Sequence, residues 1–278
     1  MAYDLTELGP TTGVEIRGLS GKQIVDPDVA DVALDALDRR GVVVFREADV
    51  SDDDLVAFSR LLGKVAQLPL GGDGEHPEIQ KVTRDASQSK LAAYREGTFF
   101  WHIDGTTAEV PDKATVLTAR QVSDDDSGDT EFANTYAAYA ELSPGQKAEI
   151  DGLRVVHSFA ASQLLVYPDP DPVEREAWDR NPSREHPLVW TRGSGKKSMV
   201  LGSTAERIVG KPDEQSKALL ERLLEWSTQD RFVLRHRWRV GDLVIWDNTG
   251  MLHRARPYGA QSARLMLRTS LVGEEVVR

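Results

Sequence analysis

A histidine and an aspartate separated by one residue, His102 and Asp104, have the types and spacing to hold a metal ion. On an extended strand, residues i and i+2 project from the same face, so the imidazole and the carboxylate would point together. Divalent iron commonly binds two histidines and one carboxylate and keeps its other positions open. The pair therefore predicts two of the three protein ligands of an iron site.

The spacing alone is weak, because the chain contains 6 histidines and 45 acidic residues among 278. About one His-x-acid pair is expected by chance in a sequence of this composition. A second pair, His76 and Glu78, lies in a glycine-rich loop without a strand leading into it. We expect this second pair to face solvent, as loop residues generally do.

The third ligand must come from a distant segment, and His253 meets this requirement. It follows the apolar strand expected at 242–248 and a short turn. Beyond it, Arg264 and Arg268 alternate with leucines, and a period of two places both arginines on one face of a strand. Arginines that face a protein interior are costly unless they meet anions, so this segment predicts an anionic ligand.

Composition excludes several other classes of function. The net charge is −11 and the pI is about 5.1, so no basic excess is available for nucleic acid or an anionic membrane surface. The chain has no cysteine, which excludes disulfides, thiolate-bound metals and cysteine nucleophiles. The opening "MAYDLTELGP" does not resemble a secretory signal, and no apolar run is long enough to span a membrane. We therefore expect a cytoplasmic enzyme or binding protein.

The elements that must position these residues begin with helices and end with strands. The first expected element is a helix, because residues 29–41 have helical spacing and Gly41 can stop it. A strand at 42–46 follows. The next element is a helix at 51–65, capped by Ser51 and ending at Gly63. Two further helical regions are expected at 134–153, broken near Pro144, and at 214–229. Strands are expected at 114–122, 154–160, 186–192, 197–203, 230–239, 242–248 and 263–272.

Many strands without regular βαβ alternation favour a sandwich or barrel such as a jelly roll. We expect one domain over residues 1–278, mainly β with flanking α-helices. The proline-rich region around 160–187 is expected to form a lid-like excursion within that domain, because such long irregular connections are often functional.

The ordered motifs resemble the taurine dioxygenase / 2,4-dichlorophenoxyacetate dioxygenase family of Fe(II)- and 2-oxoglutarate-dependent oxygenases. The resemblance runs from "GVVVFR" to "RLMLRTSLVG" and implies a double-stranded β-helix, or jelly roll, with helices packed outside. Its most specific parts are "WHIDGT", "SGDTEFANTYAAYAELS", "HPLVWTRGSGKKSMVLG" and "GDLVIWDNTGMLHRA" followed by "RLMLRTS".

Position by position, the resemblance implies that His102, Asp104 and His253 are the catalytic iron ligands. It implies that Thr130 and Arg264 hold the distal carboxylate of 2-oxoglutarate, which agrees with the fit between a guanidinium fork and a carboxylate. With Fe(II), 2-oxoglutarate and O2 as cofactor and cosubstrates, the expected reaction is hydroxylation of a substrate C–H bond. The carboxylate of Asp104 favours hydroxylation over halogenation, because related halogenases leave that position empty for a halide.

The resemblance assigns the substrate pocket to Arg268, Ser162, Leu68, Gly71 and Thr98. Arg268 matches a position that often contacts an anionic substrate group, and Ser162 is retained. Leu68, Gly71 and Thr98 stand near places where taurine-specific members have histidine, tyrosine and asparagine. These differences predict a small anionic substrate, a carboxylate, sulfonate or sulfate ester, whose body is larger and more apolar than taurine.

Two alternatives to this function stay open at the level of sequence. One is a related oxygenase that tailors a natural product or an amino-acid derivative. The other is a jelly-roll metal protein without oxygenase activity, which would not bind 2-oxoglutarate and would be indifferent to Arg264→Ala. A homodimer or homotetramer is expected, since symmetric assembly is common among such proteins.

Other candidate residues receive structural interpretations. His157 is expected to pack near the site without binding metal, and His186 is expected to have a structural role. His236, among alternating arginine and tryptophan residues, is expected to face solvent. Trp246 and Asp247 fit either the surroundings of the site or an ordinary core and turn.

Overall fold

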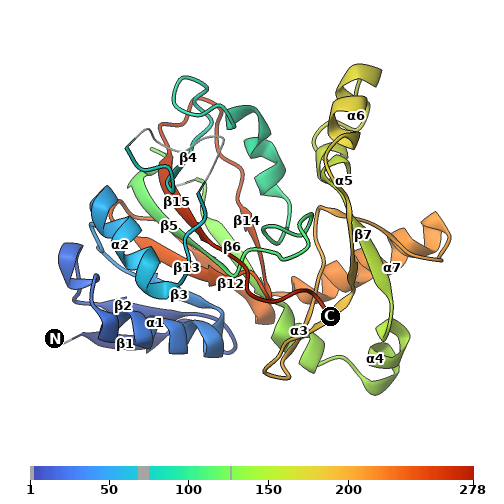
Figure 1. Ribbon diagram of the computed structural model, residues 1–278, viewed down its shortest axis with the longest axis horizontal. Helices are drawn as coiled ribbons and strands as arrows, with labels where there is room; N and C mark the ends of the chain where they lie inside the picture. The colour runs from blue at the N-terminus through green and yellow to red at the C-terminus, as the bar shows by residue number, and fades with distance from the viewer. Residues whose placement is uncertain (1–2, 68–74, 126) are drawn as a thin grey trace.

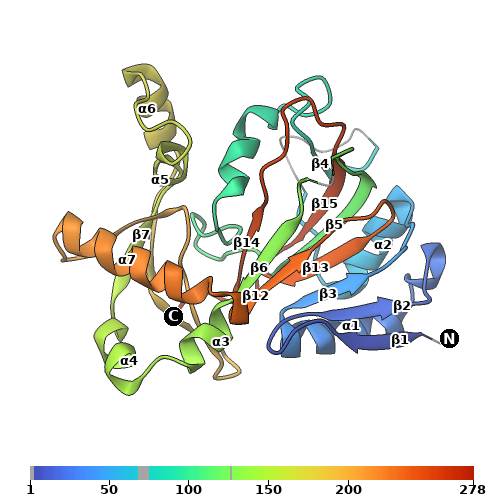
Figure 2. The same ribbon diagram turned by 180° about the vertical axis from the view of Figure 1, so that it is seen from behind.

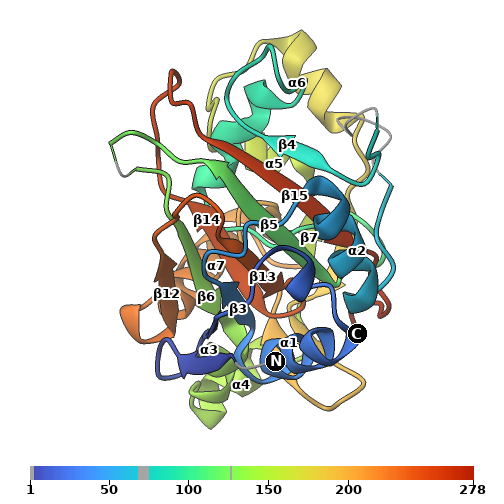
Figure 3. The same cartoon turned by 90° about the vertical axis from the view of Figure 1, so that its left-hand side faces the viewer.

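The computed structural model describes residues 3–67, 75–125 and 127–278, and its centre is a twisted seven-stranded sheet (Figure 1). All neighbouring strands of this sheet are antiparallel except β2 and β3, which are parallel. From one edge to the other, the strands are β1 (Asp4–Glu7), β2 (Val14–Arg17), β3 (Val42–Phe45), β13 (Leu243–Asp247), β5 (Ala114–Gln121), β15 (Leu265–Leu271) and β4 (Gln80–Val82). Figure 3 shows β13, β5 and β15 running side by side.

A three-stranded sheet faces the large one and closes the jelly roll. Its order is β12 (Val233–His236), β6 (Thr130–Asn134) and β14 (Met251–Ala255). Phe132 and Met251 of this sheet pack with Val44, Leu117 and other residues of the large sheet in one buried cluster. The expected mainly β fold with flanking helices, a double-stranded β-helix, is therefore confirmed.

Alternation along the strands decides which residues enter the space between the two sheets. On β3, Val42 and Val44 belong to the inner cluster, whereas Val43 and Phe45 pack on the opposite face. On β15, Met266 faces inward while Leu267 and Leu271 face outward. Because successive side chains of a strand point to opposite faces, the inward positions of several strands converge on one interior space.

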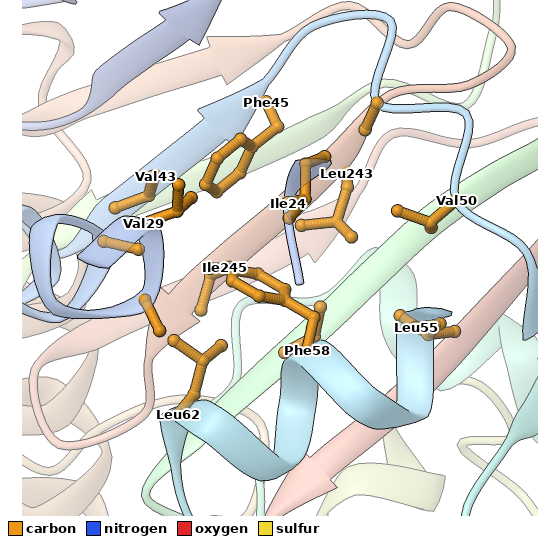
Figure 4. Packing of buried hydrophobic residues seen from close by; sticks show 14 of the residues in the cluster. Ile24, Val29, Val43, Phe45, Val50, Leu55, Phe58, Leu62, Leu243 and Ile245 are labelled. Atoms are coloured by element: carbon orange, nitrogen blue, oxygen red, sulfur yellow. The ribbon is translucent and has the colours of Figure 1, made fainter. Parts of the chain in front are cut away.

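Two helices cover the outer face of the large sheet, α1 (Pro27–Arg40) and α2 (Asp52–Leu62). Figure 4 shows their apolar side chains against Phe45 and Ile245. The predicted stops are confirmed, although α1 begins at Pro27, two residues before the expected start: Gly41, whose φ of 72° suits a glycine cap, follows the last residue of α1. Ser51 caps α2 by accepting a hydrogen bond from the Asp54 amide, and Gly63 follows its last residue.

Helices α3 (Thr135–Ala140), α4 (Pro144–Ile150) and α7 (Asp213–Ser227) lie beside the jelly roll in the other half of the molecule (Figure 2), and a second buried cluster packs among the elements there. Helix α7 packs there against α3 and β11 (Ala205–Ile208). The remaining elements are β7 (Arg154–His157), β8 (Arg184–Pro187), β9 (Val189–Thr191), β10 (Lys197–Met199) and the short helices η1 (Gly21–Gln23), η2 (Ala92–Phe99) and η3 (Asp230–Phe232). The predicted helical break falls at Pro144, the first residue of α4.

The region around 160–187 is built as an arm that projects from the body (Figure 1). Helices α5 (Phe159–Leu164) and α6 (Pro172–Asp179) pack against each other within it. Asp171 caps α6 by accepting hydrogen bonds from the amides of Val173 and Glu174. Its role as a lid, and the assignment of the chain to one domain, stay predictions.

Several predicted strands are too long. The expected strand at 154–160 ends at His157, because Ser158 caps helix α5. The expected strand at 186–192 is divided between β8 and β9, which belong to different sheets. The expected strand at 230–239 begins with η3 and continues only as Val233–His236. Among the described residues, no helix is long and apolar enough to cross a membrane.

Candidate active site

The site begins with a two-way backbone bridge between His102 and His253. The amide of His102 donates to the carbonyl of His253 at 3.0 Å, and the amide of His253 donates back at 2.8 Å. The two imidazole centroids are 4.1 Å apart. His102 was expected at the end of a strand; instead it forms an isolated bridge, and β14 supplies the strand through His253.

Asp104 completes a group of three potential metal ligands. One ligand atom from each of His102, Asp104 and His253 lies within 4.8 Å of the others. Oδ2 of Asp104 is 3.5 Å from Nε2 of His253. Across residues 3–67, 75–125 and 127–278, no other group of three histidines and carboxylates meets this criterion.

The donor set fits a divalent metal. Nδ1 of His102 lies 2.8 Å from the carbonyl oxygen of Phe100, to which its N–H can donate, so Nε2 is left as a ligand. Burial lowers the pKa of His102, and it lowers the pKa of His253 well below its ordinary value, despite the attraction of Asp104. Both imidazoles are therefore neutral near pH 7, which is the form that binds metal.

The Asp104 carboxylate is held in its charged form. Burial alone would raise its pKa, but Arg268, the two histidines and a hydrogen bond from Thr115 together hold that pKa well below its usual range. Nη2 of Arg268 is 2.9 Å from Oδ2, and the Thr115 hydroxyl is 2.8 Å from the same oxygen. A charged carboxylate beside two neutral imidazoles suits Fe(II).

The inward strand positions explain why these groups meet. Thr115 of β5 has the same parity as Leu117, and Arg268 of β15 has the same parity as Met266, both of which face the interior. His253 of β14 likewise shares its face with Met251. The jelly roll thus delivers an imidazole, a hydroxyl and a guanidinium to one space.

Thr130 and Arg264, expected to hold 2-oxoglutarate, both border this interior. Thr130 is the first residue of β6 and pairs with Ala255 of β14, two residues after His253. Arg264 is buried, and its guanidinium carbon lies 4.9 Å from the centre of the Tyr258 ring. A Cβ at Gly128 would lie 2.9 Å from Cδ of Arg264, so this glycine gives the arginine its room.

Arg264 precedes β15, and the register with β5 shifts between Leu265 and Met266. Strict alternation therefore does not relate Arg264 to Arg268, contrary to the expected pattern. The charges of both guanidinium groups nevertheless lower the pKa of Arg95, after burial as the main cause, so both act on this one buried cation.

The remaining predicted pocket residues lie on two neighbouring elements. Thr98 is in η2, where its hydroxyl donates to the carbonyl of Arg95 at 2.6 Å. Ser162 is in α5, where its hydroxyl donates to the carbonyl of Phe159 at 2.7 Å. The rings of Tyr94 and Phe159, 5.8 Å apart, join the two elements. The predicted pocket residues Leu68 and Gly71 lie outside the described residues.

Two interpretations of histidines are wrong. His236 is buried, not solvent-facing, because Nε2 lies 3.3 Å from the fully buried carboxylate of Asp242. The pair at 76–78 is also not simply exposed: His76 is partly buried and Glu78 is buried, with its carboxylate 2.6 Å from Arg60. The polar residues that flank these histidines in the sequence suggested exposure, but they do not reveal the ion pairs with Asp242 and Arg60 that accompany burial.

The structural roles of two other histidines are confirmed. His157 is fully buried, and Nδ1 is hydrogen-bonded to the hydroxyl of Thr204 at 2.9 Å. Nε2 of His186 lies 3.0 Å from the carbonyl oxygens of Thr106 and Ala108, so its N–H can hold the turn after Asp104. Neither histidine belongs to the metal-ligand group.

Trp246 and Asp247 have different surroundings. The Trp246 ring packs on the His253 imidazole, with centroids 4.7 Å apart, so it limits the movement of that ligand. Asp247 is turned to another network, where its carboxylate accepts from the amide of Thr249 at 2.8 Å and from the hydroxyl of Tyr136 at 3.2 Å.

Three residues of the site had no role in the sequence interpretation: Thr115, Asn248 and Arg95. Asn248 follows β13, and its amide group donates to the Thr115 hydroxyl at 2.9 Å. Arg95 is 7% exposed and lies in η2. Thr115 could have been predicted to face the interior, because it alternates with other inward residues on a predicted strand. Arg95 could not, because the 3-10 helix that carries it leaves no such pattern in the sequence.

A large hollow in the structure does not coincide with the candidate metal site. A hollow of about 960 Å³ lies between α5, α7 and β11, lined by Leu164, Leu220, Leu224 and other residues. It contains Arg254 but neither His253 nor the other two metal-ligand candidates. It therefore opens on the other side of β14 from the candidate metal site.

Comparisons with known proteins agree with this geometry. A family model described as "Taurine catabolism dioxygenase TauD, TfdA family" matches residues 4–270. The alpha-ketoglutarate-dependent 2,4-dichlorophenoxyacetate dioxygenase of Cupriavidus pinatubonensis is 36% identical over 87% of this chain and 88% of its own length. The alpha-ketoglutarate-dependent sulfate ester dioxygenase of Pseudomonas putida is 31% identical over 99% of this chain and 91% of its own length.

Solved structures are similar over the whole chain. AAD-2, solved in complex with Mn(II) and N-oxalylglycine, has a TM-score of 0.83 and 29% identity, with both chains fully covered. A taurine dioxygenase from Burkholderia xenovorans has a TM-score of 0.80 and 30% identity over 99% of this chain and 91% of its own. The chain therefore belongs to the TauD/TfdA family and is a dioxygenase that depends on α-ketoglutarate (2-oxoglutarate).

Proposed function

We propose that this dioxygenase uses Fe(II) and 2-oxoglutarate to hydroxylate a C–H bond of a small anionic organic substrate. The observation that carries the proposal is the convergence of His102, Asp104 and His253 with the half-buried Arg268, together with the buried Arg264 that immediately precedes the strand of Arg268. When bound, iron would activate O2, the oxidant: one oxygen atom enters the substrate as a hydroxyl group, and the other enters succinate as 2-oxoglutarate loses CO2.

The residues of the site would bind the metal and 2-oxoglutarate according to their charges. Neutral His102 and His253 with charged Asp104 would bind the metal. Arg264 with the Thr130 hydroxyl would hold the distal carboxylate of 2-oxoglutarate through charge-assisted hydrogen bonds. The sheet interior would exclude bulk water from the reacting groups.

The pocket favours a substrate with an apolar body. Aromatic rings lie beside Arg264: its guanidinium carbon is 4.9 Å from the centre of the Tyr258 ring, which is 5.5 Å from the Phe99 ring. Two 2,4-dichlorophenoxyacetate dioxygenases are 36% and 35% identical to this chain. An aryloxy acid therefore suits the site better than taurine, which offers a smaller body and a cationic amine.

The test is an anaerobic titration with Fe(II) and then 2-oxoglutarate, followed by visible absorption. We expect a weak metal-to-ligand charge-transfer band in the wild-type protein and none in His102→Ala. Arg264→Met should bind the metal but require far more 2-oxoglutarate for the same band. Metal binding without any band in the wild type would overturn the proposal.

The substrate part has its own test. Succinate formation is measured with 2,4-dichlorophenoxyacetate, hexyl sulfate and taurine as separate substrates. We expect the larger anions to exceed taurine in kcat/KM. Equal or better use of taurine would contradict the preference, and activity only on a neutral natural product or amino-acid derivative would favour the tailoring alternative.

Assembly and location stay predictions. Homodimers or homotetramers are expected from the frequency of symmetric assembly, and light scattering of the purified protein measures this directly. A cytoplasmic location is likewise a prediction, which fractionation of the producing cells can check.

A further inference from the structure

Arg95 is a buried cation whose partner is missing from the described part of the chain. Its side chain is 7% exposed, and its Nη2 donates to the carbonyl of Lys81 at 3.0 Å. Among the residues described, Arg95 forms no ion pair, and its Nε is buried without a hydrogen-bond partner. An unpaired buried guanidinium is costly, so its retention calls for an anion that the described residues do not provide.

The position of Arg95 points to the active site. Lys81 lies in β4 and pairs with Leu267 of β15, directly beside Arg268. The hydrogen bond to Lys81 therefore anchors the Arg95 guanidinium next to the strand that carries Arg268. Burial, assisted by the charges of Arg268 and Arg264 and opposed by that of Asp104, lowers the pKa of Arg95 to about 10. Arg95 is thus charged at pH 7 and lies within electrostatic reach of the candidate metal site.

The charges of the filled site support the same conclusion. Arg95, Arg264, Arg268 and a divalent ion carry five positive charges, whereas Asp104 and 2-oxoglutarate carry three negative ones. Asp112, 3.7 Å from Arg268, neutralises one more positive charge when it is ionised. Burial raises the pKa of Asp112 and so favours its neutral form. At least one positive charge is left for the substrate.

We propose, on the basis of the proposed function, that Arg95 is a second anion-binding residue of the substrate pocket and shares the substrate's oxyanion with Arg268. The ligand class is a carboxylate, sulfonate or sulfate attached to an apolar body. The free Nε–H of Arg95 supplies a donor for one oxygen. The Phe99 ring, four residues away in the same helix, is 5.5 Å from the Tyr258 ring, and these two rings offer an apolar surface for the body of such a substrate.

The test compares Arg95→Met with Arg84→Met. Arg84 also fastens η2, but it is already paired: its guanidinium contacts Glu96 and donates to the carbonyl of Tyr258 at 2.7 Å. Loss of Arg84 therefore reports loosening of η2 without loss of the proposed anion contact. Arg95→Lys keeps the charge and should show a smaller defect, which keeps the proposal testable if the methionine variant does not fold.

The measurements are steady-state kinetics with 2,4-dichlorophenoxyacetate, hexyl sulfate and taurine, and anaerobic titration of the 2-oxoglutarate band with each anion. We expect Arg95→Met to raise KM and the substrate Kd about 10- to 100-fold, with kcat changed much less. The affinity for 2-oxoglutarate should not change. The neutral 2,4-dichlorophenoxyacetamide should bind the variant and the wild type equally.

Three outcomes would overturn the proposal: an unchanged substrate Kd, an equal loss for the acid and the neutral amide, or the same defect in Arg84→Met. The absence of any anion effect on the wild-type band would also overturn it. Failure of the proposed function is distinguishable, because then the wild-type protein would form no band with Fe(II) and 2-oxoglutarate at all.

Discussion

The Thr115 hydroxyl donates a 2.8 Å hydrogen bond to Oδ2 of Asp104 and accepts a 2.9 Å hydrogen bond from the amide of Asn248. A hydroxyl has one proton, so accepting from Asn248 directs that proton to the carboxylate. The metal-ligand candidate on a loop is thereby fixed to β5 and to the residue that follows β13. Partners of this kind orient metal ligands and tune their affinity.

Thr115→Val should weaken metal binding about 10- to 100-fold, because it keeps the shape of the side chain and removes the hydroxyl. The measurement is an anaerobic titration with Fe(II) or Co(II) followed by absorption. The matched control is Thr118→Val on the same strand: Thr118 is fully buried, and its hydroxyl has no hydrogen-bond partner. Equal metal affinities in the two variants would contradict the proposed orientation of Asp104.

Gly202→Ala should destabilise the protein and disturb the site. A Cβ there would lie 2.6 Å from the carbonyl oxygen of Trp101 and 2.9 Å from Cα of His102, both backbone atoms, and φ is +109°. We expect a loss of about 2–4 kcal/mol in the free energy of unfolding, with weaker metal binding. The measurement is urea denaturation.

Gly210→Ala is the control for that substitution. Gly210 also has a positive φ of 78°, but nothing lies within 4 Å of its added Cβ. It should lose only about 1 kcal/mol, the cost of the backbone conformation. Similar losses at both glycines would show that crowding beside His102 is unimportant.

Local signals predicted the parts of the fold that depend on local interactions. The cap Ser51 and the stops at Gly41 and Gly63 act within one turn of their helices, so α2 and the end of α1 were predictable, whereas the cap Asp26 was missed. The pairing of His102 and Asp104 as metal-ligand candidates was also predictable from their spacing. One backbone bridge between His102 and His253 of β14 is enough to bring the pair to the third candidate.

Features that depend on distant partners were not predictable in this way. His236 lies among charged residues in the sequence, yet its imidazole is buried beside the carboxylate of Asp242. Arg95 has no local pattern, because its position depends on η2 packing near β4 and β15. The strand expected at 186–192 is divided because β8 pairs with β7 whereas β9 pairs with β10.

Removal of the metal should lower thermal stability. His102 is joined to β14 only by an isolated bridge, so a metal bound by both histidines and Asp104 adds a cross-link that the unfolded chain lacks. At a free metal concentration of about 100 times Kd, binding adds about 2.7 kcal/mol. Melting with Fe(II) and with a chelator under anaerobic conditions should differ by several degrees. His102→Ala should melt at the same temperature with and without metal, and a metal-dependent shift in that variant would contradict the assignment.

Acid should destabilise the metal-free protein through His157. Burial, with a smaller effect of the neighbouring His186, lowers the pKa of His157 from 6.5 to about 3. Between these two pH values the unfolded chain binds a proton that the folded protein excludes, so stability falls as the pH falls from 6.5 toward 3. One such group contributes a slope of about 1.4 kcal/mol per pH unit inside the window and none above it.

The variant His157→Gln isolates this contribution, because it removes the titrating ring and retains a polar group near Thr204. Urea denaturation of the metal-free protein from pH 8 to pH 4.5 gives the free energy of unfolding at each pH. Above pH 7 the variant and the wild type should differ by a constant amount, set by the lost packing. Below pH 6 the curves should converge, since only the wild type must keep the imidazole of His157 unprotonated, whereas the other buried histidines are common to both proteins. Parallel curves down to pH 4.5 would mean that His157 is protonated in the folded state, and burial would then not control its charge.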